Sequence, residues 1–185
     1  MRGGLALSTA VVLSLATGAV RADEFLVVDL SGGKDAARYP AKVVTASDSS
    51  VFAADDVYKT DRLVLRRVPA QTFWMGVGDN GDITASSNRH LVRLTHDFCL
   101  GVFPVTQRQY ELVTGQTPSA FAQAADAARH PVERLDYEAL AASDGFFARL
   151  NAKVVAEGLE GAFALPTEAQ WEFACRAGTL TTYFW

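Results

Sequence analysis

The segment Phe163-Ala-Leu-Pro-Thr-Glu-Ala-Gln-Trp-Glu-Phe-Ala-Cys-Arg-Ala-Gly178 decides the fold, because it encodes a short strand followed at once by a helix with both ends marked. Thr167 is a natural N-cap residue, and Gln170 three positions later can return a hydrogen bond to it as a capping box. Gly178 supplies the left-handed residue that ends many helices. The sequence therefore predicts a strand–helix unit that begins and ends at defined residues.

The expected helix carries a narrow polar stripe on an otherwise apolar surface. Glu168, Glu172 and Arg176 recur every four residues, so they share one face. The remaining positions, Trp171 among them, are mostly apolar over a face too wide for a surface helix. We therefore expect this helix to pack against the core on most of its sides.

The segment resembles the Arg-Leu-Pro-Thr-Glu-Ala-Glu-Trp-Glu-Tyr-Ala signature of the formylglycine-generating-enzyme family, also called sulfatase-modifying factors. It departs at Ala164, where the family usually has Arg, and at Gln170, where it usually has Glu. The resemblance covers about residues 62–185 and implies an α+β, C-type-lectin-like fold that is incomplete at its C-terminus, with only the N-terminal half of the family domain. Weaker similarities lie upstream, at Val68-Pro69-Ala70-Gln71-Thr72-Phe73, Leu100-Gly101-Val102-Phe103-Pro104-Val105-Thr106, Thr117-Pro118-Ser119 and His130-Pro131-Val132.

Residues 1–22 have the features of a secretory signal peptide. Arg2 gives a short basic start, an apolar run follows from Leu5 to Ala16, and Val20-Arg21-Ala22 forms a small-residue cleavage site. An uncleaved membrane anchor is the alternative, because no charge interrupts the apolar run. We expect an exported protein, periplasmic or extracellular, with no membrane attachment after cleavage.

The charge balance argues against nucleic acid as a partner. The 185 residues include 17 Lys and Arg against 21 Asp and Glu, a net charge of −4. Cleavage after residue 22 would remove two arginines and leave 15 basic residues, a net charge of −6. No basic patch is then available to displace the counterions of a phosphate backbone.

The upstream chain divides into a leader and the domain proper. We expect residues 23–61 to form an N-terminal leader with a strand at Glu24–Leu30 and a short strand at Lys42–Thr45. The β-rich runs Arg62–Val68 and Thr72–Gly76 flank a three-residue break containing Pro, which predicts a hairpin. Alternating patterns predict two more strands, at 90–94 and 98–103.

Three more helices are expected upstream of the signature segment. The first of them has the same start and stop signals as the signature helix: Thr106 and Gln109 form a capping box, and Gly115 ends the helix. Two turns are expected at Asp136–Ala142. A fresh helix then begins at Ser143 or Asp144 and continues to Glu157, with Phe146, Phe147, Leu150 and Val154 as its buried stripe.

The histidines and arginines do not form a recognisable catalytic or metal pattern. His90 and His96 could share a strand face, but a metal site needs a third ligand, and solvated histidines are the simpler interpretation. His130 before Pro131 is expected to form hydrogen bonds in a loop. Arg66 and Arg67 are expected to face opposite sides of a strand.

Cys99 and Cys175 are the only cysteines. Export permits a disulfide, but the sequence gives no distance between them. Arg176 could stabilise a thiolate at its neighbour Cys175. Adjacent helix residues point about 100° apart, however, so we expect Cys175 to be a buried structural cysteine.

For an intact domain, the resemblance implies copper- and oxygen-dependent oxidation of a cysteine in a sulfatase polypeptide to formylglycine. The family's copper-binding cysteine pair belongs to a region C-terminal of the segment that opens with Phe163, and neither Cys99 nor Cys175 matches it. We therefore assign no catalytic, cofactor-binding or metal residue to this chain. The alternative is a noncatalytic C-type-lectin-like binding module.

Overall fold

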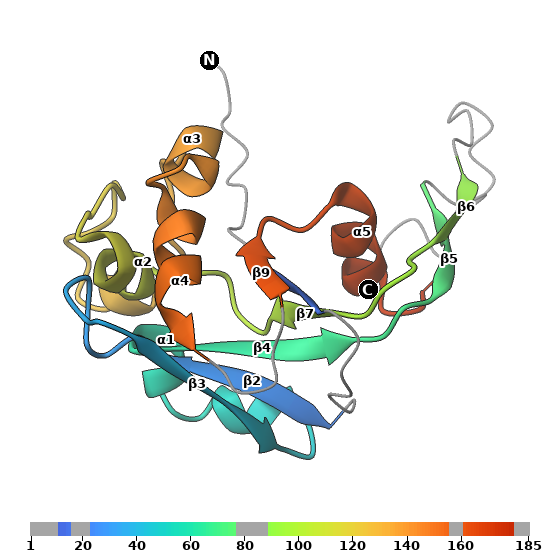
Figure 1. The fold of residues 1–185 in the computed structure, drawn as a ribbon, viewed down its shortest axis with the longest axis horizontal. Coiled ribbons are helices and arrows are strands. Elements are labelled where there is room, and N and C mark those ends of the chain that lie inside the picture. The colour runs from blue at the N-terminus through green and yellow to red at the C-terminus, as the bar shows by residue number, and fades with distance from the viewer. Residues whose placement is uncertain (1–10, 16–22, 77–88, 156–160, 180–185) are drawn as a thin grey trace.

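The computed structural model describes residues 11–15, 23–76, 89–155 and 161–179, and in them the main element is a seven-stranded sheet (Figure 1). Its strand order is β8-β3-β2-β4-β7-β1-β9, and all neighbours are antiparallel except β3 and β8. The strands β5 and β6 form a separate two-stranded sheet. The strands are β1 (Val12–Leu15), β2 (Glu24–Asp29), β3 (Tyr39–Thr45), β4 (Arg62–Val68), β5 (Thr72–Met75), β6 (His90–Arg93), β7 (Phe98–Gly101), β8 (Val154–Val155) and β9 (Gly161–Ala164).

Helices cover both faces of the large sheet. In Figure 1, α2 to α5 lie on one side of it, and the short elements η1 and α1 lie on the other. No helix of the described residues is long and apolar enough to cross a membrane. The helices are η1 (Ser49–Phe52), α1 (Val57–Thr60), α2 (Gln107–Thr114), η2 (Ala127–Arg129), α3 (Tyr137–Ala141), α4 (Phe146–Lys153) and α5 (Glu168–Arg176).

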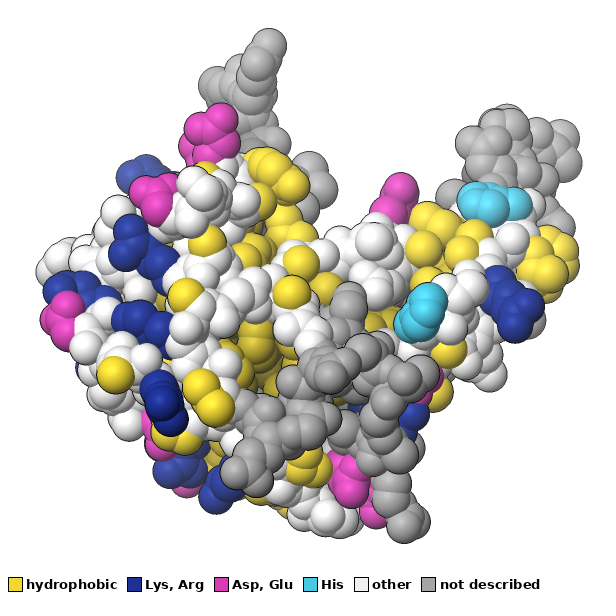
Figure 2. All heavy atoms as spheres, viewed as in Figure 1, with side chains coloured by type: hydrophobic (Ala, Val, Ile, Leu, Met, Phe, Trp, Pro, Cys, Tyr) yellow, Lys and Arg dark blue, Asp and Glu magenta, His cyan; other side chains and the backbone are white. Residues whose placement is uncertain are grey.

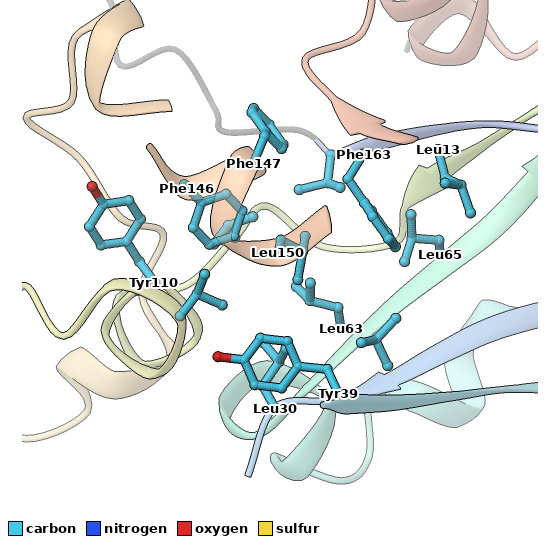
Figure 3. Close-up of a cluster of buried hydrophobic side chains, with 14 of the residues drawn as sticks. Leu13, Leu30, Tyr39, Leu63, Leu65, Tyr110, Phe146, Phe147, Leu150 and Phe163 are labelled. Carbon is cyan, nitrogen blue, oxygen red and sulfur yellow. The ribbon is translucent and has the colours of Figure 1, made fainter. Parts of the chain in front are cut away.

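The larger core lies between the sheet and the helices α2 and α4 (Figure 3). The ring of Tyr110 on α2 stacks on that of Phe146 on α4 at 5.5 Å between centroids. Tyr39 is fully buried, and its hydroxyl donates to the carbonyl of Gly33 at 3.0 Å, so its polar atom is satisfied. A smaller cluster on the opposite face contains Phe25, Val27, Phe52 and Val64.

Two strands of the large sheet, β2 and β3, come from residues 23–61, where the sequence predicts a leader that precedes the domain. The strand expected at Glu24–Leu30 is β2, and it pairs with both β3 and β4. Every residue from Phe25 to Val28 is buried, because the cores on the two faces of the sheet cover both sides of this strand. The short strand expected at Lys42–Thr45 is the second half of β3.

The hairpin expected around Pro69 does not form. β4 pairs with β2 and β7, whereas β5 continues away from the large sheet and pairs with β6. Asp97 fixes this path, since its carboxylate accepts a hydrogen bond from the Ala70 backbone N–H at 2.6 Å and pairs with Arg67. The break has no residue with positive φ, which the common tight hairpin turns require.

The helices confirm two expectations and correct a third. Thr106 and Gln109 form the predicted capping box, and Gly115 ends α2 with φ of 77°. Helix α3 (Tyr137–Ala141) lies within the two turns expected at Asp136–Ala142, and the Asp136 side chain caps its start. Helix α4 ends at Lys153, four residues earlier than predicted, because the β-branched pair Val154–Val155 forms β8 against β3.

Strand β1 comes from the expected signal peptide. It lies between β7 and β9, antiparallel to both, with Leu13 opposite Cys99 on one side and Phe163 on the other. The cleavage site itself lies outside the described residues, so cleavage after Ala22 stays a prediction.

Candidate functional site

The signature segment forms β9 and α5, joined as the sequence predicts. The Thr167 hydroxyl accepts a hydrogen bond from the Gln170 backbone N–H at 3.2 Å. The Gln170 side-chain oxygen accepts from the Thr167 backbone N–H at 2.9 Å. The helix ends one residue before the predicted stop, because Ala177 already has left-handed backbone angles, φ 46° and ψ 36°. Gly178 follows with φ of 89°.

The polar stripe of α5 binds the end of β5. One Glu172 carboxylate oxygen accepts from the Gly76 backbone N–H at 2.7 Å and from Arg176 Nε at 2.7 Å. Arg176 also donates to the Gly76 carbonyl at 2.5 Å, which closes a ring of three hydrogen bonds. Next to it, the rings of Phe73 and Phe173 pack at 5.1 Å between centroids. These contacts fix α5 to β5, 96 residues away in sequence.

The Glu172 carboxylate is held in its charged form. Partial burial opposes ionisation, but the hydrogen bonds from Gly76 and Arg176 outweigh it, so the pKa of Glu172 lies below its ordinary value. The side chains of Glu172 and Arg176 retain only 19% and 16% of their exposure. This ion pair is therefore well shielded from solvent and contributes more than a typical surface pair.

The burial predicted for α5 is wrong. No residue of α5 is buried, and Trp171 is 49% exposed. The physical reason is that the helix turns Glu172 and Arg176, together with Phe173, toward β5 and leaves Trp171 on its outer side. Cys175 is likewise only half-buried, which corrects the expectation of a fully buried thiol.

An apolar groove of about 370 Å³ lies beside the signature strand. Figure 2 shows hydrophobic side chains gathered between α4 and β9. Asn151 of α4 holds the groove wall: its side-chain amide donates to the Phe163 carbonyl at 2.9 Å and accepts from the Phe163 N–H at 2.7 Å. The other lining residues include Tyr137, Ser143, Phe147 and Leu165.

The groove was not predicted from the sequence. Asn151 lies within a helix, and no local pattern marks it as the residue that binds the backbone of β9 twelve positions later. The two hydrogen bonds of its amide reproduce those of a neighbouring strand, so α4 covers the outer edge of β9. The first residues of the signature segment, Phe163 to Leu165, thus line the groove, and its later residues form α5.

The two cysteines are free, and their environments differ. Cys99 on β7 is completely buried. Burial raises the pKa of the Cys99 thiol to about 12, although the nearby Arg67 opposes the shift. Cys175 lies on α5 next to Arg176, but that guanidinium is already bound to Glu172 and Gly76.

The three histidines have different neighbours. His90 lies on β6 and contributes to lowering the pKa of Glu172, whereas His96 Nδ1 is 2.9 Å from the Thr95 hydroxyl. His130 Nε2 is 3.1 Å from Asp126. Among the described residues, no group of three or more His, Cys, Asp or Glu side chains could hold a metal ion.

The two adjacent arginines face opposite sides of β4, as expected. Arg66 lies over the ring of Phe25 at 6.0 Å, on the side of the smaller cluster. Arg67 pairs in register with Cys99 and forms its ion pair with Asp97. Hydrogen bonds, first from the Ala70 N–H and then from Arg67, hold the pKa of Asp97 below its ordinary value. Both arginines therefore have structural partners.

The sheet, the capped helix α5 and its signature residues define a mixed α/β domain of the sulfatase-modifying type. Residues 48–185 match the family model of the sulfatase-modifying factor enzyme 1-like domain, the FGE-sulfatase family. This match covers most of the chain, so the protein belongs to that family. Searches of curated proteins and of solved structures gave no match.

Proposed function

We propose that this chain is an exported formylglycine-generating-enzyme-like protein with a C-type-lectin-like fold. In this proposal it binds a sulfatase polypeptide in the groove between α4 and β9, but its own cysteines do not oxidise the bound cysteine. The family match and the position of the groove beside the signature strand support the binding role. The signal-like residues 1–22 support export.

The observation that carries the proposal is the environment of the two thiols. A reactive cysteine needs a stabilised thiolate and access to its substrate. Cys99 has neither, because it is buried and its pKa is raised to about 12. Cys175 is more accessible, but its nearest cationic neighbour in sequence, Arg176, is committed to Glu172 and the Gly76 carbonyl.

Copper is the cofactor that the family resemblance implies, and the residues of this chain do not fit it. A copper site with soft ligands requires thiolates close together. Cys99 is fixed within the sheet and remains protonated at neutral pH, while Cys175 belongs to α5. We therefore derive no catalytic step through a metal in this chain.

An activity assay tests the chemical part of the proposal. The purified chain is incubated with copper, oxygen and a Cys-x-Pro-x-Arg peptide, and the aldehyde product is sought by mass. We expect no formylglycine. Product formation that disappears in Cys175→Ser would show that this thiol is catalytic and would overturn the proposal.

A binding assay tests the groove. A fluorescent Cys-x-Pro-x-Arg peptide is titrated with the full chain, with Tyr137→Ala and with Phe121→Ala. Tyr137 lines the groove and Phe121 does not, yet both are highly exposed, at 72% and 69%. We expect Tyr137→Ala alone to weaken binding, by about fivefold for a loss near 1 kcal/mol. Equal effects of the two variants would contradict a role of the groove.

A noncatalytic binding module with another ligand is the second candidate. The apolar lining of the groove favours it, because such a surface does not by itself select a sulfatase sequence. A scrambled peptide distinguishes the two. If the scrambled peptide binds as tightly as the ordered one, the module is the correct interpretation.

A further inference from the structure

The ribbon of β5 and β6 projects beyond the end of the large sheet, and α5 packs against one of its faces (Figure 1). Phe73 lies on that packed face, where its ring contacts Phe173 of α5. The next residue, Trp74, points to the opposite face, because successive side chains of a strand alternate. There it stands opposite Leu91 of β6, and the two side chains are 46% and 59% exposed. The ribbon therefore presents an apolar pair to solvent.

Two arginines flank this apolar pair on the same face. The guanidinium carbon of Arg89 lies 5.2 Å from the centroid of the Trp74 ring. Arg93 is exposed and lies two residues beyond Leu91, about 7 Å along the strand and on the same side of it. Among the ion pairs of the described residues, none involves Arg89 or Arg93. Figure 2 shows hydrophobic and basic side chains together at the end of the molecule where the ribbon lies. We call Trp74, Arg89, Leu91 and Arg93 the ribbon face.

The free edge of β6 lies beside the ribbon face. The Leu94 N–H donates to the Gln71 carbonyl at 2.9 Å, so the alternating antiparallel pattern turns the backbone groups of Leu91 and Arg93 away from β5. In the part of the chain that the structure describes, β6 pairs with β5 and with no other strand. A two-stranded ribbon with an open edge can accept an extended peptide as a third strand. Alternate side chains of that peptide then lie beside Leu91 and Arg93.

We propose that the ribbon face binds an extended acidic segment of a protein partner, with the pattern acid–x–apolar–x–acid. The pattern follows from the order Arg89, Leu91, Arg93 at alternate positions: the apolar residue packs on Leu91 and Trp74, and each carboxylate pairs with one arginine. The planar guanidinium groups suit carboxylates, which they can bind through two parallel hydrogen bonds. The ribbon face shares no residue with the groove between α4 and β9, so the proposal is independent of the function assigned to that groove.

The composition of the ribbon face favours a protein segment over an anionic membrane. Tryptophan and arginine are the residue types most enriched among side chains that dominate the binding free energy of protein interfaces. Recognition of anionic lipid takes clusters of about four to eight Lys and Arg, and this face has two arginines. The open backbone edge of β6 also offers hydrogen bonds that a peptide can complete and a lipid surface cannot.

A peptide titration tests the charge complementarity. Fluorescein-labelled Thr-Glu-Thr-Leu-Thr-Glu-Thr is titrated with the full chain at low salt and followed by fluorescence anisotropy, beside the same peptide with lysines in place of the glutamates. We expect the acidic peptide to bind at least about fivefold more tightly. Arg93→Glu should reverse this preference, because it places a carboxylate opposite a carboxylate. Arg38→Glu is the matched control, since Arg38 is an exposed arginine outside the ribbon and its replacement changes the net charge equally.

A second pair of variants tests the apolar anchor. Leu91→Ser should weaken binding of the acidic peptide by at least about threefold, whereas Val43→Ser should leave it unchanged, because Val43 lies on β3 and is similarly exposed, at 43%. All four replaced side chains are exposed, so each variant should keep the fold of the parent.

Three results would overturn the proposal. The first is no difference between the acidic and basic peptides. The second is equal weakening by Arg93→Glu and Arg38→Glu, which would show attraction by net charge alone. The third is binding of the parent to phosphatidylserine vesicles that Arg93→Glu abolishes, without binding of either peptide, which would assign the ribbon face to a membrane surface instead.

Discussion

Three alanine substitutions in the signature segment should differ in their effect on the free energy of unfolding, because β9 is buried and α5 is partly exposed. Phe163 is 4% exposed in the larger core, so Phe163→Ala should lower the free energy of unfolding by about 3–5 kcal/mol. Trp171 is 49% exposed. A tryptophan buries at most about 250 Å², so half of that area at about 25 cal/mol per Å² gives an upper value near 3 kcal/mol. Partial burial in the unfolded chain reduces this to about 1–2 kcal/mol.

Thr167→Ala removes a cap acceptor and should cost about 0.5–2 kcal/mol, close to the cost at Trp171. The expected order is therefore Phe163 well above Trp171, with Trp171 and Thr167 similar. Denaturant unfolding of each variant beside the parent gives the three differences, provided that each transition is cooperative and its slope is unchanged. A Trp171→Ala loss as large as that of Phe163→Ala would refute the exposed position of this helix face.

Three further predictions concern α5 and the N-terminus. Glu172→Gln should lower the free energy of unfolding at pH values above the ordinary glutamate pKa of 4.5. The difference from the parent should shrink as pH falls, because the lowered pKa of Glu172 gives stabilisation that protonation removes. Denaturation midpoints measured from pH 3 to 7 check this. Ala177→Gly should raise the free energy of unfolding by about 0.5–1 kcal/mol by relieving the left-handed backbone at that residue, whereas Ala174→Gly within the helix should lower it by about 1 kcal/mol. Export with cleavage after Ala22 should give Asp23 as the first residue of the secreted protein by mass analysis, and an intact N-terminus in a membrane fraction would indicate an anchor instead.

The features that the sequence predicted correctly are those that depend on interactions between residues close together in the chain. Both capping boxes, at Thr106 and Thr167, appear as expected, because a cap depends on residues three positions apart. The strand β2 (Glu24–Asp29) could also be predicted, as Glu24–Leu30, because its own composition favours an extended backbone. The position of this strand inside the sheet could not be predicted, because its pairing with β4 joins residues 33 to 41 positions apart.

The candidate site was only partly predictable. The signature segment and its helix could be read from the sequence, and the family match confirms the resemblance on which they rest. The groove could not, because its wall depends on the hydrogen bonds of Asn151 to Phe163 and its lining comes from α3, α4 and β9. Composition carries no information about which helix covers the edge of which strand.

The orientation of α5 shows most directly why its burial prediction failed. Counting apolar positions assumes that a polar stripe faces water, and this holds unless the stripe finds partners elsewhere in the fold. Here Glu172 and Arg176 bind both backbone groups of Gly76 at the end of β5. Hydrogen bonds to charged groups contribute about 1.5–3 kcal/mol each, comparable to burial of one large apolar side chain. Glu172 and Arg176, with Phe173 beside them, can therefore outweigh Trp171 in deciding which face of the helix turns toward β5. No residue near α5 in the sequence reveals that Gly76 is their partner.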